Sequence, residues 1–92
     1  MVNAIILVNT RHDRINAVAE QLAELPGVSE TYSVGGSFDV VAIVRVRSNE
    51  EIAQLVTERM GGIEGIERTQ TLIAFQAYSR HDLEAVFSIG IG

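Results

Sequence analysis

The segment SVGGSFDVVAIV, residues 33–44, places one carboxylate, Asp39, directly before an apolar run. A buried charge is costly unless it is paired or hydrogen-bonded, so Asp39 needs a partner. In a structural role it accepts hydrogen bonds from the amides of its own turn. In a binding role, the amides of Gly35–Ser37 hold the carboxylate of a zwitterion and Asp39 holds its ammonium group. The two roles can coexist.

The tripeptide RHD occurs twice, each time where a helix is expected to begin. An anion or metal site would use His12, Asp13, His81 and Asp82, whereas the simpler interpretation is two helix caps with exposed neighbours. We predict Asp13 as the N-cap of the first helix. The chain has no cysteine, no Gly-rich phosphate loop and no nucleophile elbow. We therefore expect no catalytic residues, no metal and no cofactor.

The composition and net charge of the chain restrict the classes of partner that we expect it to bind. The 92 residues suit one domain, with a net charge of −5, seven arginines and no lysine. Because nucleic-acid affinity comes mostly from basic side chains on phosphates, we expect no direct DNA binding. The N-terminus has no basic n-region, and its apolar run is too short to span a bilayer. A cytoplasmic protein without membrane association, with small-molecule or protein partners, is the expectation.

An internal repeat organises the elements that position these residues. A shift of 38 residues aligns VNAIILV (2–8) with VVAIVRV (40–46), and LPGVSETYSV (25–34) with IEGIERTQTL (63–72). Each half reads strand–helix–strand. The sequence therefore predicts a ferredoxin-like βαββαβ sandwich of the α+β class, a four-stranded antiparallel sheet with two helices on one face. We expect the first and third strands at its centre, parallel to one another.

Helical periodicity places the remaining elements. Apolar stripes predict one helix through Ile15, Val18, Ala19 and Leu22, and a second through Ile52, Leu55, Val56 and Met60. Ser48 and Glu51 form a predicted capping box. The second and fourth strands are expected over 28–34 and 68–78. A short third helix is expected within 79–90, around Leu83, Val86 and Phe87.

Both faces of the central strands are apolar. Residues 40–46 present valine and alanine on one side, and Val41 and Ile43 on the other, while Ile5 and Leu7 do the same in the first strand. A strand that is apolar on both sides is normally buried on both sides. Since two helices cover only one face, we predict a homodimer through the other.

The stretch VGGSFDVVAIVRV resembles the GxxDxxL loop and strand of the Lrp/AsnC effector domain, also called the RAM domain. Gly36 and Asp39 match the motif, and Ala42 replaces its leucine. LPGVSETYSV and IEGIERTQTLIAF resemble the two Gly–hydrophobic blocks that open the second and fourth strands of that family. We therefore divide the chain into a RAM-like domain, 1–78, and a C-terminal helical extension, 79–92.

The resemblance implies a function. It implies oligomerisation through the sheet, often into rings of dimers, and amino-acid binding where subunits meet. The implied ligand-binding residues are Gly36 and Asp39, with Tyr32, Ser37, Phe38, Thr69 and Thr71 as further candidates. The chain begins at the first strand, so we expect a stand-alone effector domain without the family's helix-turn-helix. It would modulate full-length Lrp/AsnC relatives by mixed assembly.

Two alternatives share this fold. A small enzyme of the dimeric α+β barrel type, such as a monooxygenase or isomerase, would enclose substrate between paired sheets. The chain has no tryptophan and no histidine placed mid-strand as a base, which argues against it. An ACT-like amino-acid-binding domain would place its ligand at the first strand–helix loop, but NTRHD lacks the expected glycine there.

Overall fold

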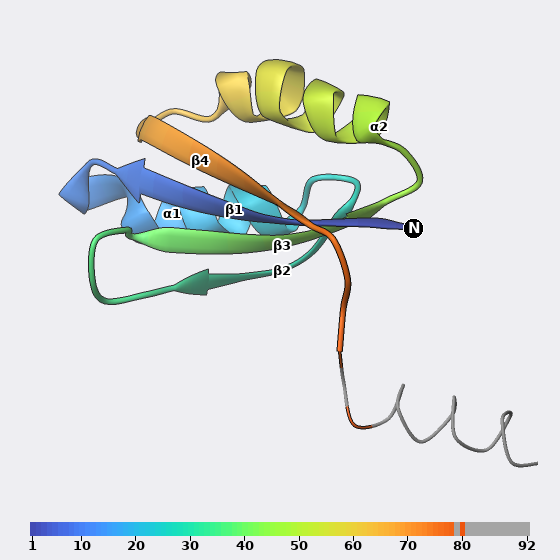
Figure 1. Ribbon diagram of the computed structural model, residues 1–92. Coiled ribbons are helices and arrows are strands. Elements are labelled where there is room, and N and C mark those ends of the chain that lie inside the picture. The colour runs from blue at the N-terminus through green and yellow to red at the C-terminus, as the bar shows by residue number, and fades with distance from the viewer. Residues whose placement is uncertain (79, 81–92) are drawn as a thin grey trace, which may run out of the picture.

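The computed structural model describes residues 1–78 and 80 (Figure 1). The strands are β1 (Val2–Thr10), β2 (Val28–Ser33), β3 (Val40–Val46) and β4 (Ile66–Ala74). Within residues 1–78 the α-helices are α1 (Ile15–Ala23) and α2 (Asn49–Gln54). Shorter turns of helix complete the set: the 3-10 turns η1 (His12–Arg14) and η3 (Met60–Gly62), and a π-helical turn, η2 (Leu55–Arg59), that continues α2.

The strands form one sheet in the order β2-β3-β1-β4, and every neighbouring pair is antiparallel. This confirms the ferredoxin-like α+β fold and the central place of the first and third strands. The expectation that those two strands are parallel was wrong. The α1 crossover makes β1 and β2 run in the same direction, and the loop after β2 then reverses the chain into β3.

The core lies between the sheet and the helices. Alternate residues of the central strands are buried on this face, among them Ile6, Val8, Val40 and Val44, each with no exposed surface. They pack with the predicted helix stripes, of which Val18, Leu22, Ile52, Leu55 and Met60 are buried. Full burial of such a side chain contributes about 1.5–3 kcal/mol. The period-2 pattern of the strands thus places the sheet under both helices.

The two helix starts differ from one another. At α2, the Ser48 hydroxyl accepts a hydrogen bond from Glu51 N at 3.3 Å, as the capping box predicts. The Glu51 carboxylate accepts from Arg47 N at 3.0 Å, one residue before the cap. Asp13 is not the cap of α1, because η1 intervenes and its carboxylate instead accepts hydrogen bonds from the Arg11 guanidinium. That prediction was wrong.

Gly27 and Gly65 occupy matching places in the two halves of the repeat, each before the strand that ends its half. Both have positive φ, +92° and +103°. A Cβ at Gly65 would lie 2.6 Å from Arg14 Cβ, and one at Gly27 would lie 2.7 Å from Val46 Cγ1. Both the backbone conformation and the lack of space therefore require glycine.

The C-terminal side of the fold ends earlier than expected. β4 begins at Ile66 and ends at Ala74, whereas the sequence predicted a strand over 68–78. Its last pair in the sheet is Ala74 with Asn3. Residues 75–78 run on past the sheet (Figure 1). The third helix predicted within 79–90 lies outside the described residues. In the described part of the chain, no helix is long and apolar enough to cross a membrane.

Candidate functional site

The loop of residues 34–39 joins β2 to β3. A hydrogen bond from Val34 N to Asp39 O, 3.0 Å long, closes its base. Gly36 has a φ of +123° with open space around it, so the backbone conformation alone favours glycine there. The loop is therefore a fixed turn whose tip, Gly35–Ser37, is exposed.

Asp39 holds this loop to the end of β1. Its backbone N–H donates to Val8 O at 2.9 Å, and its Oδ2 accepts from Thr10 N at 2.8 Å. β3 has no residue opposite Thr10, since the β1–β3 ladder ends at the pair Val8–Val40. The carboxylate therefore replaces the missing ladder acceptor. We expected Asp39 to bind amides of its own turn, but the amide belongs to β1.

A second contact fixes the loop tip. Asn9 Nδ2 donates a hydrogen bond of 2.9 Å to Ser37 O. Three successive positions of β1, Val8, Asn9 and Thr10, thus contact the loop at three different atoms. The placement of the exposed loop amides depends on this end of β1.

Beside these contacts lies a cavity of about 570 Å³, which we call the Asp39 pocket. It is lined by Asn9, Thr10, His12, Ser37, Asp39, Glu67 and Arg68. Of the residues predicted for the ligand site, it contains Ser37 and Asp39. The lining residues from β1 and β4 were missed, because their proximity arises only when β1 lies between β3 and β4.

The charges of the Asp39 pocket suit a zwitterion. Asp39 and Glu67 supply carboxylates, and Arg68 supplies a guanidinium. Within the described part of the chain, Asp39 Oδ1 accepts no hydrogen bond, and the N–H groups of Gly35–Ser37 donate none. Carboxylate acceptors for an ammonium group, Asp39 and Glu67, and a guanidinium donor for a carboxylate, Arg68, therefore line one cavity, with the loop tip beside it.

The other predicted site residues lie apart from the cavity lining. Phe38 is half-buried and does not line it. Thr69 and Thr71 pair with the core residues Val8 and Ile6, which places them on the helix-covered face of β4. Tyr32 is 49% exposed on the opposite face, paired with Val41. A side-chain hydrogen bond with Glu30 and the negative charge of that residue raise the pKa of the Tyr32 phenol.

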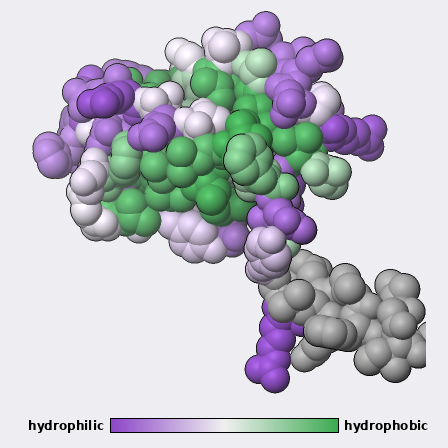
Figure 2. Space-filling view, in the orientation of Figure 1, coloured by the Kyte–Doolittle hydropathy of each residue, from purple (hydrophilic) through white to green (hydrophobic). Residues whose placement is uncertain are grey.

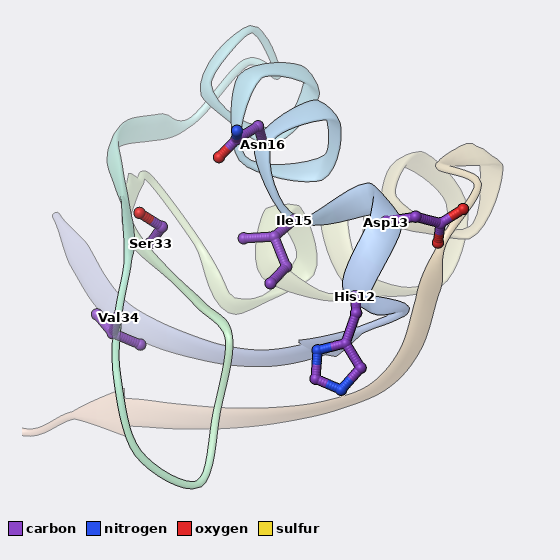
Figure 3. Close-up of a pocket in the computed structure, with 6 residues that line it drawn as sticks. All are labelled: His12, Asp13, Ile15, Asn16, Ser33 and Val34. Atoms are coloured by element: carbon purple, nitrogen blue, oxygen red, sulfur yellow. The ribbon is translucent and has the colours of Figure 1, made fainter.

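A second cavity, of about 400 Å³, lies between the start of α1 and the end of β2 (Figure 3). His12 lines both cavities. Figure 3 shows the Asp13 carboxylate pointing away from Ser33 and Val34. It pairs with Arg11 at 3.2 Å, and this contact lowers the pKa of Asp13.

Only half of the metal site considered for the RHD tripeptides, His12 and Asp13, lies within the described residues. The residues that the structure describes contain no group of three or more side chains able to hold a metal ion. His81 and Asp82, the other half of that candidate site, lie outside the described residues.

Comparisons with known proteins agree with the fold. The sequence model of the family described as Lrp/AsnC ligand binding domain matches residues 3–83. The uncharacterised HTH-type transcriptional regulator PF0250 of Pyrococcus furiosus is 40% identical over 58 residues, which are 63% of this chain and 39% of that protein. The chain thus spans about two fifths of the length of this curated relative.

Two solved structures share the fold. TTHA0845 from Thermus thermophilus superposes with a TM-score of 0.81 and 48% identity, covering 87% of this chain and 100% of that one. The transcriptional regulator NMB0573 from Neisseria meningitidis, solved as a complex with L-Met, superposes with a TM-score of 0.76 at 16% identity. That match covers 86% of this chain and 53% of the regulator.

Proposed function

The chain belongs to the Lrp/AsnC ligand-binding domain family, and on that premise we propose that it is an amino-acid-sensing module whose ligand site is the Asp39 pocket. One observation carries the proposal. The Asp39 carboxylate has one oxygen engaged by Thr10 N and the other without a partner among the described residues. An acid held through one oxygen, in the lining of a cavity that also contains the Arg68 guanidinium and Ser37, suits a free amino acid.

The ligand would lie across the loop. Its ammonium group donates to Asp39 Oδ1 and to Glu67, while the amides of Gly35–Ser37 and the Arg68 guanidinium receive its carboxylate. Charge-assisted hydrogen bonds of this kind contribute about 1.5–3 kcal/mol each. NMB0573, which shares the fold, was solved with L-Met, a ligand of this chemical class.

We propose that the protein works as an oligomer. Five side chains on the sheet face away from the helices form a surface that we call the open face: Ile5, Leu7, Val41, Ile43 and Leu72. Ile5 pairs directly with both Ile43 and Leu72, so the apolar surface crosses three strands. In Figure 2 hydrophobic residues gather over β1 and β3. A second copy would bury this surface, and further subunits would cover the Asp39 pocket.

We propose that the function of the protein is regulatory and non-enzymatic. PF0250, one of the curated relatives that the chain matches, is named as a transcriptional regulator, and the match spans only part of it. We propose that the module acts in the cytoplasm by assembling with full-length Lrp/AsnC relatives, without contacting DNA itself. Ligand binding would change that assembly.

Isothermal titration calorimetry with each of the twenty amino acids tests the ligand site. We expect at least one saturable ligand, and a loss of roughly ten- to hundredfold in affinity for Asp39→Asn, since one charge-assisted bond is removed. The matched control is Asp13→Asn, which removes the same charge outside the Asp39 pocket.

The outcomes separate the possible sites. Absence of binding for all twenty amino acids contradicts amino-acid sensing. Weaker binding for Asp13→Asn with unchanged binding for Asp39→Asn would move the ligand to the second cavity, at the strand–helix loop favoured by the ACT-like alternative.

A further inference from the structure

Residues 75–78 carry two largely exposed aromatic side chains, and the Tyr78 hydroxyl donates a hydrogen bond of 2.9 Å to Gln76 Oε1 within the same segment. Phe75 is 102% exposed and Tyr78 is 74% exposed. Figure 1 shows the chain leaving the sheet after β4 and running away from the body of the fold. Exposed aromatic rings on a chain segment outside the core are typical of contacts with another molecule.

Among the described residues, the segment has no neighbouring strand of its own copy to pair with. β1 begins at Val2, and Asn3 is its first residue paired with β4, opposite Ala74. Beyond Ala74 the neighbouring strand offers only Val2 and Met1, and Met1 is itself 87% exposed. The aromatic residues therefore lie past the end of their own sheet.

The segment is continuous with the open face. Leu72, which is 41% exposed, and Ala74, which directly precedes Phe75, both lie on that face through their pairing with Ile5 and Asn3. From Ala74 to Tyr78 an extended chain reaches roughly 13 Å. That is enough to cross from one sheet to a sheet packed about 10 Å away, face to face.

We propose that residues 75–78 form an exchange arm, which places Phe75 and Tyr78 on the open face of a second copy of this chain. The arm rests on the proposed dimer and adds a contact to it. In a two-fold dimer the exchange is reciprocal, so each copy gives one arm and receives one. The arm covers apolar surface that a flat contact between two twisted sheets leaves open at their ends.

Sedimentation equilibrium of the full chain measures the contribution of the arm. The double variant Phe75→Ser with Tyr78→Ser should raise the dimer dissociation constant by at least about tenfold, because each dimer loses two pairs of buried rings. The matched control is Ala77→Ser, at an exposed position between the two aromatic residues, which should leave the constant within about twofold. Equal constants for the double variant and the unmodified chain overturn the arm.

A photo-crosslink locates the arm. Copies carrying p-benzoylphenylalanine at position 75 are mixed with uniformly ¹⁵N-labelled copies, irradiated and analysed by peptide mass spectrometry. We expect adducts on ¹⁵N peptides from β1 or β3. Adducts confined to the chain's own peptides or to the helices, or none at all, contradict the exchange.

Different experimental results would contradict the proposed dimer and the proposed arm. If the unmodified chain is a monomer at micromolar concentration, the proposed dimer fails and the arm fails with it. If the chain dimerises and Ile43→Asp disrupts the dimer while the double variant does not, the open-face dimer stands and the arm alone is wrong.

Discussion

Asp39 shows how one side chain can serve both architecture and binding. Its backbone N–H donates to Val8 O and its Oδ2 accepts from Thr10 N, so Asp39 adds two hydrogen bonds to β1 just before β3 begins. Because Oδ2 is bound to Thr10 N, the backbone of β1 also fixes the position of Oδ1. A ligand therefore meets an acid that is already positioned, which reduces the entropy lost on binding.

The structural half of this role can be measured without ligand. Asp39→Ala leaves Thr10 N without its acceptor, so we expect a loss of about 1.5–3 kcal/mol in the free energy of unfolding. Asp39→Asn retains a carbonyl acceptor and should lose about 1 kcal/mol or less. Urea denaturation at one fixed protein concentration makes the comparison. Equal losses for the two variants would contradict the role of Oδ2 as a ladder acceptor.

Gly65 gives a second test at this scale. Gly65→Ala would force a Cβ to 2.6 Å from Arg14 Cβ at a φ of +103°, so we expect destabilisation of about 1–3 kcal/mol. Gly61→Ala is the matched control, because no atom lies within 4 Å of its added Cβ and its φ is not positive. Thermal unfolding should lower Tm for the first variant and leave it unchanged or higher for the second.

At the scale of elements, the two helix starts were expected to be alike, and the structure makes them different. Ser48 caps α2, whereas Asp13 lies in η1 and pairs with Arg11. Ser48→Ala should therefore cost about 1 kcal/mol of stability. Asp13→Ala removes only an exposed ion pair and should cost much less. Denaturation midpoints that fall equally for both variants would show that Asp13 acts as a cap after all.

Strand positions and helix stripes could be predicted from the sequence because burial imposes a period on residues such as Val40, Ala42 and Val44. The directions of the central strands follow from the βαββαβ order itself, since the helical crossover makes β1 and β2 parallel and the next loop reverses the chain, so the parallel expectation was an error of topology. The Asp39 pocket was only half predicted. Glu67 and Arg68 reach it through sheet order, whereas the GGSFD loop was visible as a local motif. The π-helical turn η2 has no local signal in the sequence.

At the scale of the whole molecule, the open face determines whether the protein is a monomer or an oligomer in solution. Ile43→Asp would place a charge in the middle of that face, opposite Ile5. If the face is buried against a second copy, an unpaired charge there costs several kcal/mol, and we expect a monomer at micromolar concentration. Gln21→Asp, on the exposed side of α1, is the matched control and should leave the oligomer intact.

Sedimentation velocity of the unmodified chain and both variants gives the answer directly. A stable monomer of the unmodified chain, or identical behaviour of the Ile43→Asp and Gln21→Asp variants, would contradict the open-face interface. A dimer lost only in Ile43→Asp would support it.

The strand order β2-β3-β1-β4 also determines when, during synthesis on the ribosome, each strand can pair with its neighbours. β1 is the first strand to emerge, and its two neighbours in the sheet are made third and last. Ile6 and Val8 therefore gain β3 as a neighbour only after translation has passed residue 46, and the other edge of β1 stays uncovered until translation has passed residue 74. At about 5–20 residues per second this delay lasts several seconds. During that time the most apolar strand of the nascent chain remains exposed to chaperones, and to identical chains emerging from neighbouring ribosomes on the same message.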